Sequence, residues 1–250
     1  METPLLNKGL YNRIRRHLPP QKSRRRVNDR LVISGILWVI LTGSAWRQVP
    51  EFYGKWKTIY SRFRRWSQSG IWEKIFRIFA KRVKKRNNGM IDSTYLKAHR
   101  TASSCACREK ERLIGTSKGG KTTKLHLLCN EEGIPFNFLI TGGEVSDIKV
   151  ALDLVGAFPL TGLIADKAYG SKALREELEA KGIKVCIPPK INAKVKYPFD
   201  ARLYKKRHKI ENIFARIKDP KSIALRMCRC AHTFISFISL TIIHKFFNAD

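Results

Sequence analysis

Three acidic residues lie where the sequence could use them for chemistry. Asp92 and Asp166 each lie near the C-terminal end of a predicted strand, and Glu211 lies in an amphipathic helical pattern. In an open α/β sheet, functional sites form at the carboxyl ends of the strands. If these two strands are neighbours, about 4.8 Å apart, both Asp carboxylates can share divalent metal ions. Taken singly, aspartates at strand ends are more often loop caps.

Glu211 belongs to a predicted helix over residues 202–218. At about 100° per residue, Tyr204, Glu211 and Lys218 align at heptad spacing, with Arg207 about 60° away. The adjoining apolar stripe consists of Ile210, Ile213, Phe214 and Ile217. Glu211 is therefore expected at the edge of the buried face. The simpler interpretation is an ordinary amphipathic helix with an Arg207–Glu211 ion pair, which stabilises it by about 0.2–0.5 kcal/mol.

The overall charge favours a nucleic-acid partner for such an acidic set. The 250 residues include 50 Lys and Arg against 20 Asp and Glu, a net charge of +30. An excess of this size on a folded chain indicates a polyanion, with nucleic acid first and acidic membrane second. Two cations about 3.5–4 Å apart can activate an attacking hydroxyl and stabilise a leaving oxygen at a phosphodiester. Together these features predict DNA strand cleavage or transfer.

The elements that must position these residues fall into two predicted domains. Residues 1–86 hold 22 of the Lys and Arg but only four of the Asp and Glu, and show helical periodicity over 31–43, 55–68 and 71–85. This predicts a small basic all-α domain with helix-turn-helix-like spacing. Its stripe of aromatic residues is typical of core packing. Its basic face could follow DNA phosphates through Arg62, Arg64 and Arg65.

Residues 87–250 change to short strands followed by alternating strands and helices. The order predicts an α/β fold with a mixed sheet flanked by helices. Strands are expected over residues 90–95, 124–129, 135–140, 162–166 and 183–187, and helices over 146–156, 171–181, 202–218 and 231–247.

Two other motifs compete with the acidic set. Residues 115–122 match the phosphate-loop pattern, but a polar stretch precedes them and a predicted strand follows, whereas the motif needs a strand and then a helix. A flexible basic loop is the better interpretation, and Lys118 and Lys121 on it could contact DNA. A four-sulfur zinc site is disfavoured because its cysteine pairs have one-residue spacing and lie far apart: Cys105, Cys107, Cys228 and Cys230.

The remaining features favour a reducing compartment. Six cysteines are too few and too irregular for a secreted disulfide framework, and the first residues show no signal-peptide pattern. The apolar stretches 31–46 and 233–247 are shorter than the ~20 residues that a membrane span needs. We therefore expect a cytoplasmic protein without membrane contact.

Several motifs together resemble the DDE transposases of bacterial insertion sequences, most closely the insertion sequence family five (IS4/IS5-like) group. The shared segments are 90–94, 115–126, 139–147, 165–171 and the signature Tyr204-x2-Arg207-x3-Glu211-x6-Lys218. Residues 27–72 also resemble the helical domain of that group. The resemblance covers nearly the whole chain, and the signature around Glu211 is its most specific part.

The resemblance implies a ribonuclease H-like catalytic core in which Asp92, Asp166 and Glu211 bind two Mg²⁺ ions, with Mn²⁺ able to substitute. It implies that Tyr204, Arg207 and Lys218 contact transposon-end DNA or position the helix of Glu211. The expected partners are terminal inverted repeats and target DNA, bound by a homodimer in the synaptic complex. The expected location is the bacterial cytoplasm, associated with the nucleoid.

The chain also departs from the family pattern. Pro220 follows the signature helix, and Met227-Cys228 replaces an expected polar segment. Pro cannot continue a helix without losing a hydrogen bond, so the packing of the C-terminal region is in question. Two alternatives therefore stay open: a non-catalytic DNA-binding protein, either decayed or regulatory, and a metal-dependent DNA nuclease without strand transfer.

Overall fold

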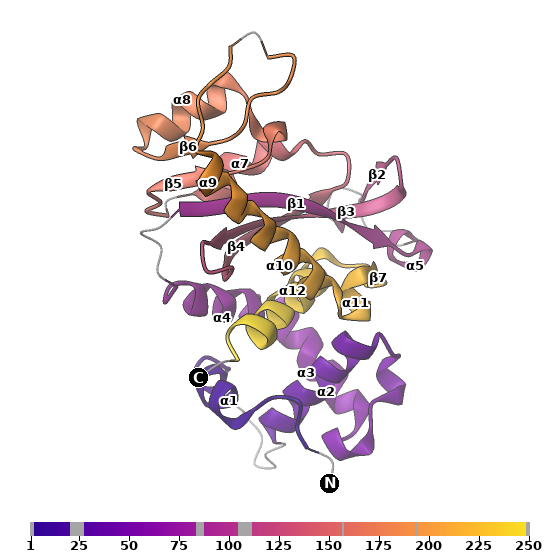
Figure 1. Ribbon diagram of the computed structural model, residues 1–250. Helices are drawn as coiled ribbons and strands as arrows, with labels where there is room; N and C mark the ends of the chain where they lie inside the picture. The colour runs from indigo at the N-terminus through magenta and orange to yellow at the C-terminus, as the bar shows by residue number, and fades with distance from the viewer. Residues whose placement is uncertain are drawn as a thin grey trace. The chain divides into compact units, whose positions relative to one another are not determined.

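The computed structural model describes residues 3–20, 28–83, 88–104, 112–156, 158–193 and 195–248 (Figure 1). Contacts divide the chain into two compact units. The helical unit comprises residues 1–79, 98–112 and 217–250, and the sheet unit comprises 80–97 and 113–216. Because these units are discontinuous, they do not test the division into domains 1–86 and 87–250, which stays a prediction.

A mixed sheet forms the centre of the sheet unit. The path β2-β3-β1-β5-β6 runs through it, and β4 pairs with β3. The pairs among β1, β2, β3 and β4 are antiparallel, whereas β5 is parallel to both β1 and β6. The strands are β1 (Asn88–Ala98), β2 (Gly115–Ser117), β3 (Gly120–Asn130), β4 (Pro135–Gly142), β5 (Gly162–Ile164) and β6 (Lys184–Cys186).

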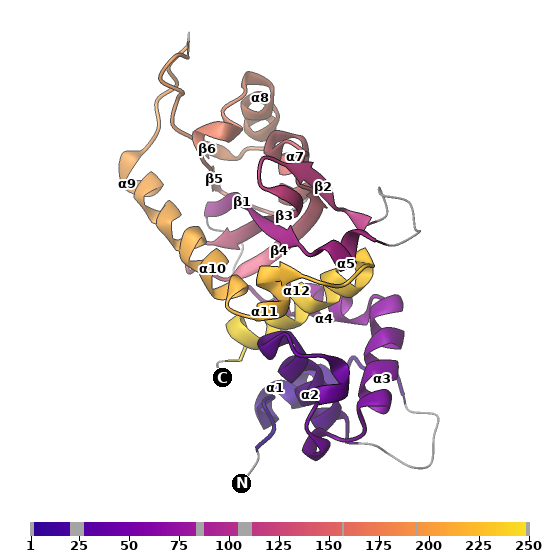
Figure 2. The same cartoon turned by 90° about the vertical axis from the view of Figure 1, so that its right-hand side faces the viewer.

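Capped helices connect and cover these strands. They are α7 (Asp147–Val155), α8 (Lys172–Ala180), α9 (Ala201–Tyr204) and α10 (His208–Lys218), with a 3₁₀ turn over Lys205–Arg207 between the last two. The Ser171 side chain caps α8, and the Asp200 side chain caps α9; such caps satisfy otherwise unpaired backbone N–H groups. Figures 1 and 2 show α7 and α8 on one side of the sheet, and in Figure 1 α9 and α10 cross in front of β1.

The helical unit combines both ends of the chain. Its main helices are α1 (Lys8–Arg15), α2 (Asp29–Thr42), α3 (Trp56–Gln68), α4 (Ile71–Ala80) and α12 (Ala231–Phe246), with 3₁₀ turns at Trp46–Gln48 and Glu51–Tyr53 and short elements α5 (Arg100–Ser103), α11 (Lys221–Ala224) and β7 (Leu225–Arg226). Helix α12 packs on α2 and α3. None of the described helices is long and apolar enough to cross a membrane.

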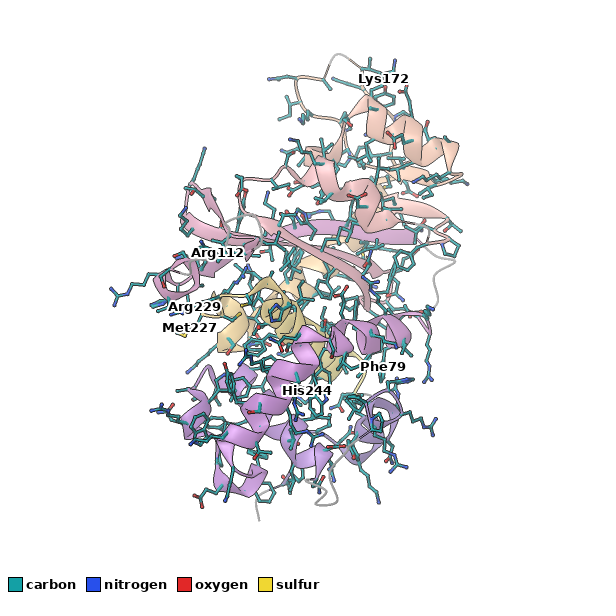
Figure 3. All side chains as sticks on the ribbon, turned by 180° about the vertical axis from the view of Figure 1, so that it is seen from behind. Phe79, Arg112, Lys172, Met227, Arg229 and His244 are labelled. Atoms are coloured by element: carbon teal, nitrogen blue, oxygen red, sulfur yellow. The ribbon has the colours of Figure 1, made fainter. Side chains whose placement is uncertain are left out.

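Aromatic contacts fix α12 in place. The Phe237 ring lies 5.1 Å from that of Phe63, and Phe247 lies 5.5 Å from Phe79 (labelled in Figure 3). Pro220 ends α10 as predicted, and it then serves as the N-cap residue of α11. The departure at Pro220 is therefore accommodated between two helices. Met227 is 53% exposed, so its side chain adds little to this core (Figure 3).

Replacing Phe237 by alanine is expected to destabilise the helical unit by about 3–5 kcal/mol, because a buried aromatic side chain leaves a cavity when it is removed. Chemical denaturation would measure the loss. Met227→Ala is the matched control, with an expected change within about 0.5 kcal/mol because the side chain is exposed. Equal unfolding midpoints for Phe237→Ala and the wild type would contradict the packing role.

Several sequence predictions need correction. The helix expected over 71–85 ends at Ala80, and the helix over 202–218 is interrupted by the 3₁₀ turn. The strand expected over 90–95 spans Asn88–Ala98, so Asp92 lies inside a strand rather than near its end. The phosphate-loop match forms the β2–β3 hairpin, not a flexible loop or a strand-to-helix turn. Cys105 and Cys107 lie outside the described residues.

Candidate active site

The parallel pairing of β1 with β5 brings Asp92 and Asp166 to the same edge. Met90 is paired with Ile164 at the end of this ladder. Asp92 and Asp166 each lie two residues beyond that pair, so the strands deliver them level with each other. The two strands are neighbours in the sheet, which is the condition that a shared site of the two aspartates required.

Asp92 is held by two hydrogen bonds. Its Oδ1 accepts the backbone N–H of Ser93 at 2.8 Å, and its Oδ2 accepts Nη1 of Arg207 at 2.8 Å. Burial raises the pKa of Asp92, an effect that the charges of Asp166 and Asp147 increase and that Ser93 and Arg207 oppose. The site thus concentrates negative charge in a partly desolvated place.

Asp166 forms the cap of the short turn that follows β5. Its Oδ1 accepts the backbone N–H of Lys167 at 2.6 Å, and the turn continues as a 3₁₀ helix over Lys167–Tyr169. The interpretation of this aspartate as a loop cap is therefore correct, because the Asp166 side chain caps the turn. The negative charge of Asp166 raises the pKa of both Asp92 and Arg207. Asp166 therefore also belongs to the acidic set.

Arg207 links Glu211 to the aspartates. Its Nη2 donates to Oε1 of Glu211 at 2.5 Å, and its Nη1 donates to Asp92. Burial alone would lower the pKa of Arg207, but Asp92, Tyr204, Glu211 and Asp166 together raise it. Glu211 itself is 56% exposed, more than expected for the edge of the core. The predicted Arg207–Glu211 ion pair is confirmed.

The donor chemistry of this set suits a hard divalent cation. Carboxylate oxygens are the ligands that Mg²⁺ prefers, and the surplus of negative charge around Asp92 would favour a cation. Among the described residues, no group of three His, Cys, Asp or Glu is arranged to hold a metal ion. The Arg207 guanidinium instead lies between Asp92 and Glu211 and supplies the positive charge.

The other predicted binding residues are distributed over both units. Tyr204 packs against Phe199, with ring centroids 5.7 Å apart, and Arg207 lies 5.9 Å from the Tyr204 ring. Lys118 and Lys121 are exposed on the β2–β3 hairpin. Lys218 is the last residue of α10 and belongs to the helical unit, where burial lowers its pKa.

The three arginines of α3 are not equivalent. Arg64 and Arg65 are exposed, as the predicted basic face requires. Arg62 is only 8% exposed, forms an ion pair with Asp29 and lies 4.4 Å from the Trp66 ring. Its predicted place on the DNA-contacting face is therefore wrong: the aromatic core and a partner on α2 bury it.

Sequence reasoning missed a polar set behind Asp92. It comprises Ser93 on β1, Lys124 and His126 on β3, and Asp147 at the start of α7. Lys124 and His126 are two apart on β3 and alternate with Leu125 and Leu127, so they share one face. That period-2 placement of polar residues was the available signal.

Burial makes His126 sensitive to acid. Burial, opposed by the charge of Asp147 and assisted by that of Lys124, lowers the pKa of His126 to about 4. Neutral His126 therefore stabilises the fold above about pH 6.5, and this stability is lost as the pH falls toward 4. We expect the free energy of unfolding in urea to decrease between pH 7 and pH 5. In His126→Asn this decrease should be smaller. An unchanged pH dependence in His126→Asn would contradict this.

The architecture is that of a ribonuclease H-like core: an antiparallel meander, parallel strands and acids at the shared edge. A solved structure shares the fold, a piggyBac transposase synaptic complex with hairpin DNA, with a TM-score of 0.55 and 8% identity over 98% of this chain and 71% of that one. The family model "Transposase DDE domain" matches residues 83–244, and "Putative transposase of IS4/5 family" matches residues 6–76. The chain belongs to the DDE transposase family.

Curated relatives agree with this assignment. A protein of Brucella ovis described as a putative transposase for insertion sequence element IS6501 is 35% identical over 122 residues, 48% of this chain and 93% of that protein. An uncharacterized 16.2 kDa protein of insertion element IS402 from Burkholderia cepacia is 28% identical over 112 residues, 39% of this chain and 76% of that protein. The predicted family, fold class and role in transposition are thereby confirmed.

Proposed function

We propose that this transposase cleaves DNA at the ends of an insertion sequence in a Mg²⁺-dependent reaction and joins the freed 3′-OH to target DNA. One observation carries the proposal: β1 and β5 deliver Asp92 and Asp166 level with each other, and Arg207 links Glu211 to Asp92. The three carboxylates would bind two Mg²⁺ ions, or Mn²⁺ in their place. Bound there, the ions would supply activation of the attacking hydroxyl and stabilisation of the leaving oxygen.

The chain's own residues have distinct proposed roles. Backbone N–H groups orient Asp92 and Asp166, whereas Glu211 reaches the site from an exposed helix position. Arg207 holds Asp92 and Glu211. If cations were bound by these carboxylates, its guanidinium would be available to pair with a DNA phosphate, for which its planar donor geometry is suited. Tyr204 and Lys218 contact the transposon end on either side of the phosphate that Arg207 binds.

DNA binding would use exposed cations of both units. Lys118 and Lys121 follow the backbone from the hairpin, and Arg64 and Arg65 do so from α3. The proposed substrates are terminal inverted repeats and target DNA, held by a homodimer in the bacterial cytoplasm next to the nucleoid. Such contacts release counterions, so affinity falls as salt rises.

The arginines of α3 provide a test within one helix. Arg64→Gln with Arg65→Gln is expected to reduce the slope of log K against log salt by about 2, because each lost phosphate contact removes about one unit. Filter binding or fluorescence anisotropy over a salt series would measure it. Arg62→Gln should instead lower the unfolding midpoint, because it removes the buried ion pair between Arg62 and Asp29. An unchanged slope in the double variant would remove α3 from the DNA interface.

Strand joining tests the function as a whole. Purified protein and a labelled, precleaved transposon-end duplex are incubated with plasmid and Mg²⁺, beside an EDTA control and Glu211→Gln. Metal-dependent joined product that is absent with Glu211→Gln supports the transposase. End binding without joining would favour the decayed or regulatory DNA-binding protein, and cleavage without joining would favour the nuclease.

A further inference from the structure

We infer that Asp147 is a positioning residue for the catalytic carboxylate of Asp92, acting through Ser93 from the opposite face of β1. The inference rests on the proposed function, because it concerns how the acids of that site are held. It assigns a role to the polar set of Ser93, Lys124, His126 and Asp147, which the proposed chemistry leaves unexplained.

The connection from Asp147 to Asp92 passes through one residue. The Ser93 hydroxyl donates to Oδ1 of Asp147 at 2.8 Å, and the Ser93 backbone N–H donates to Oδ1 of Asp92 at 2.8 Å. Successive side chains of a strand point to opposite faces. Asp147 therefore fixes Ser93 from one face of β1 while the carboxylate of Asp92 lies on the other, where it meets Arg207.

The buried Lys124 holds Asp147 itself, and His126 lies beside the same carboxylate. Lys124 Nζ lies 3.1 Å from its Oδ1, and the Lys124 side chain is only 6% exposed. Lys124 also donates to the carbonyl of Val145 at 2.7 Å, just before α7. His126 Nδ1 lies 3.7 Å from the same carboxylate, and its Nε2 is 2.9 Å from Oγ1 of Thr141 on β4. The first turn of α7 is thus anchored to the sheet by charge.

The same set extends toward the loop of Asp166. Tyr169, three residues after Asp166, is 1% exposed. Burial raises the pKa of Tyr169, and the charges of Asp147 and Asp92 raise it further. Helix α7, which Asp147 begins, also packs against the Lys167–Tyr169 turn that Asp166 caps. By fixing Ser93, the Asp147 carboxylate can orient Asp92, much as outer-shell partners orient metal ligands.

Ser93→Ala is the main test, because it removes one hydroxyl and leaves the ion pair with Lys124 in place. We expect end binding and the metal-free unfolding midpoint to stay near wild type. The Mg²⁺ or Mn²⁺ concentration for half-maximal joining should rise about 10–100-fold, as for outer-shell changes in general. The metal-induced rise in the unfolding midpoint, which needs no activity, should shrink in parallel.

Ser171→Ala is the matched control. It also removes a serine hydroxyl from a single hydrogen bond in the sheet unit, the cap of α8, and should leave the metal requirement unchanged. Asp147→Asn should raise the metal requirement at least as much as Ser93→Ala. It should also destabilise the fold, because Lys124 would stay buried without its counter-charge.

The outcomes separate the two hypotheses. The positioning role would be overturned if Ser93→Ala needed the same metal concentration for half-maximal joining as the wild type, or if Ser171→Ala changed that concentration equally. The transposase function would stand in both cases. A wild-type protein that neither joins DNA nor gains stability from Mg²⁺ or Mn²⁺ would overturn the proposed function and the positioning role together.

Discussion

Asp92→Asn and Asp166→Asn are each expected to reduce strand joining by about 10³-fold or more while transposon-end binding persists. Asparagine keeps the size of the side chain and an oxygen for the backbone N–H of Ser93 or Lys167. It removes the negative charge that would hold a cation, and preorganised charge is usually the largest single contribution to such catalysis. Joining rates and fluorescence anisotropy with end DNA would separate the two effects.

Asp153→Asn is the control for lost negative charge. Asp153 is exposed on α7 in the same unit, so its replacement should leave joining near the wild-type rate. Retention of joining within tenfold in Asp92→Asn would exclude that residue as a catalytic ligand. Loss of end binding in the same variant would point to a folding defect.

Arg207→Ala is expected to reduce joining by about 10²-fold, the second-largest effect. One guanidinium donates to Asp92 and Glu211 together, so alanine removes both the contact that orders these carboxylates before metal binding and the phosphate contact proposed for Arg207. Arg207→Lys should recover only part of the activity, because an ammonium is a point charge and cannot reproduce the planar fork. Single-turnover joining would measure both variants.

Lys206→Ala is the matched control for Arg207. Lys206 precedes Arg207 directly and pairs with Glu131 at 2.5 Å, away from the aspartates. Its loss removes the same unit charge from this segment but should change joining by no more than a few-fold. Equal losses in Lys206→Ala and Arg207→Ala would show that only the total charge of the segment matters.

Local patterns were enough to predict the acidic set. Strand runs before Asp92 and Asp166 and the heptad alignment around Glu211 are short-range signals, and the order of elements predicted the mixed sheet. The length of β1 could not be predicted in this way. Its pairing with β3 continues to Lys97 opposite Thr122, and that partner strand lies more than 20 residues away. Long-range pairing thus placed Asp92 inside a strand.

Burial of polar residues was equally beyond the sequence pattern. Arg62 belongs to a helical face that is otherwise exposed and basic, and only the packing of α3 beside Asp29 of α2 shows that it is internal. Asp147 likewise lies in the first turn of α7, where acidic residues are common. Its position in the sequence therefore gives no sign of a further role. Its role depends on Ser93 and Lys124, which come from two different strands.

The discontinuous helical unit has a consequence for synthesis on the ribosome. Phe63 on α3 finds its aromatic partner Phe237 only near the end of the chain, although domains commonly fold in N-terminal order as they emerge. The N-terminal helices therefore cannot complete their packing until α12 has been synthesised, and their apolar surface stays exposed until then. By then the ribosome has already translated Asp92, Asp166 and Glu211. A product terminated early would therefore lack a completed helical unit, even where all residues of the sheet unit have been made.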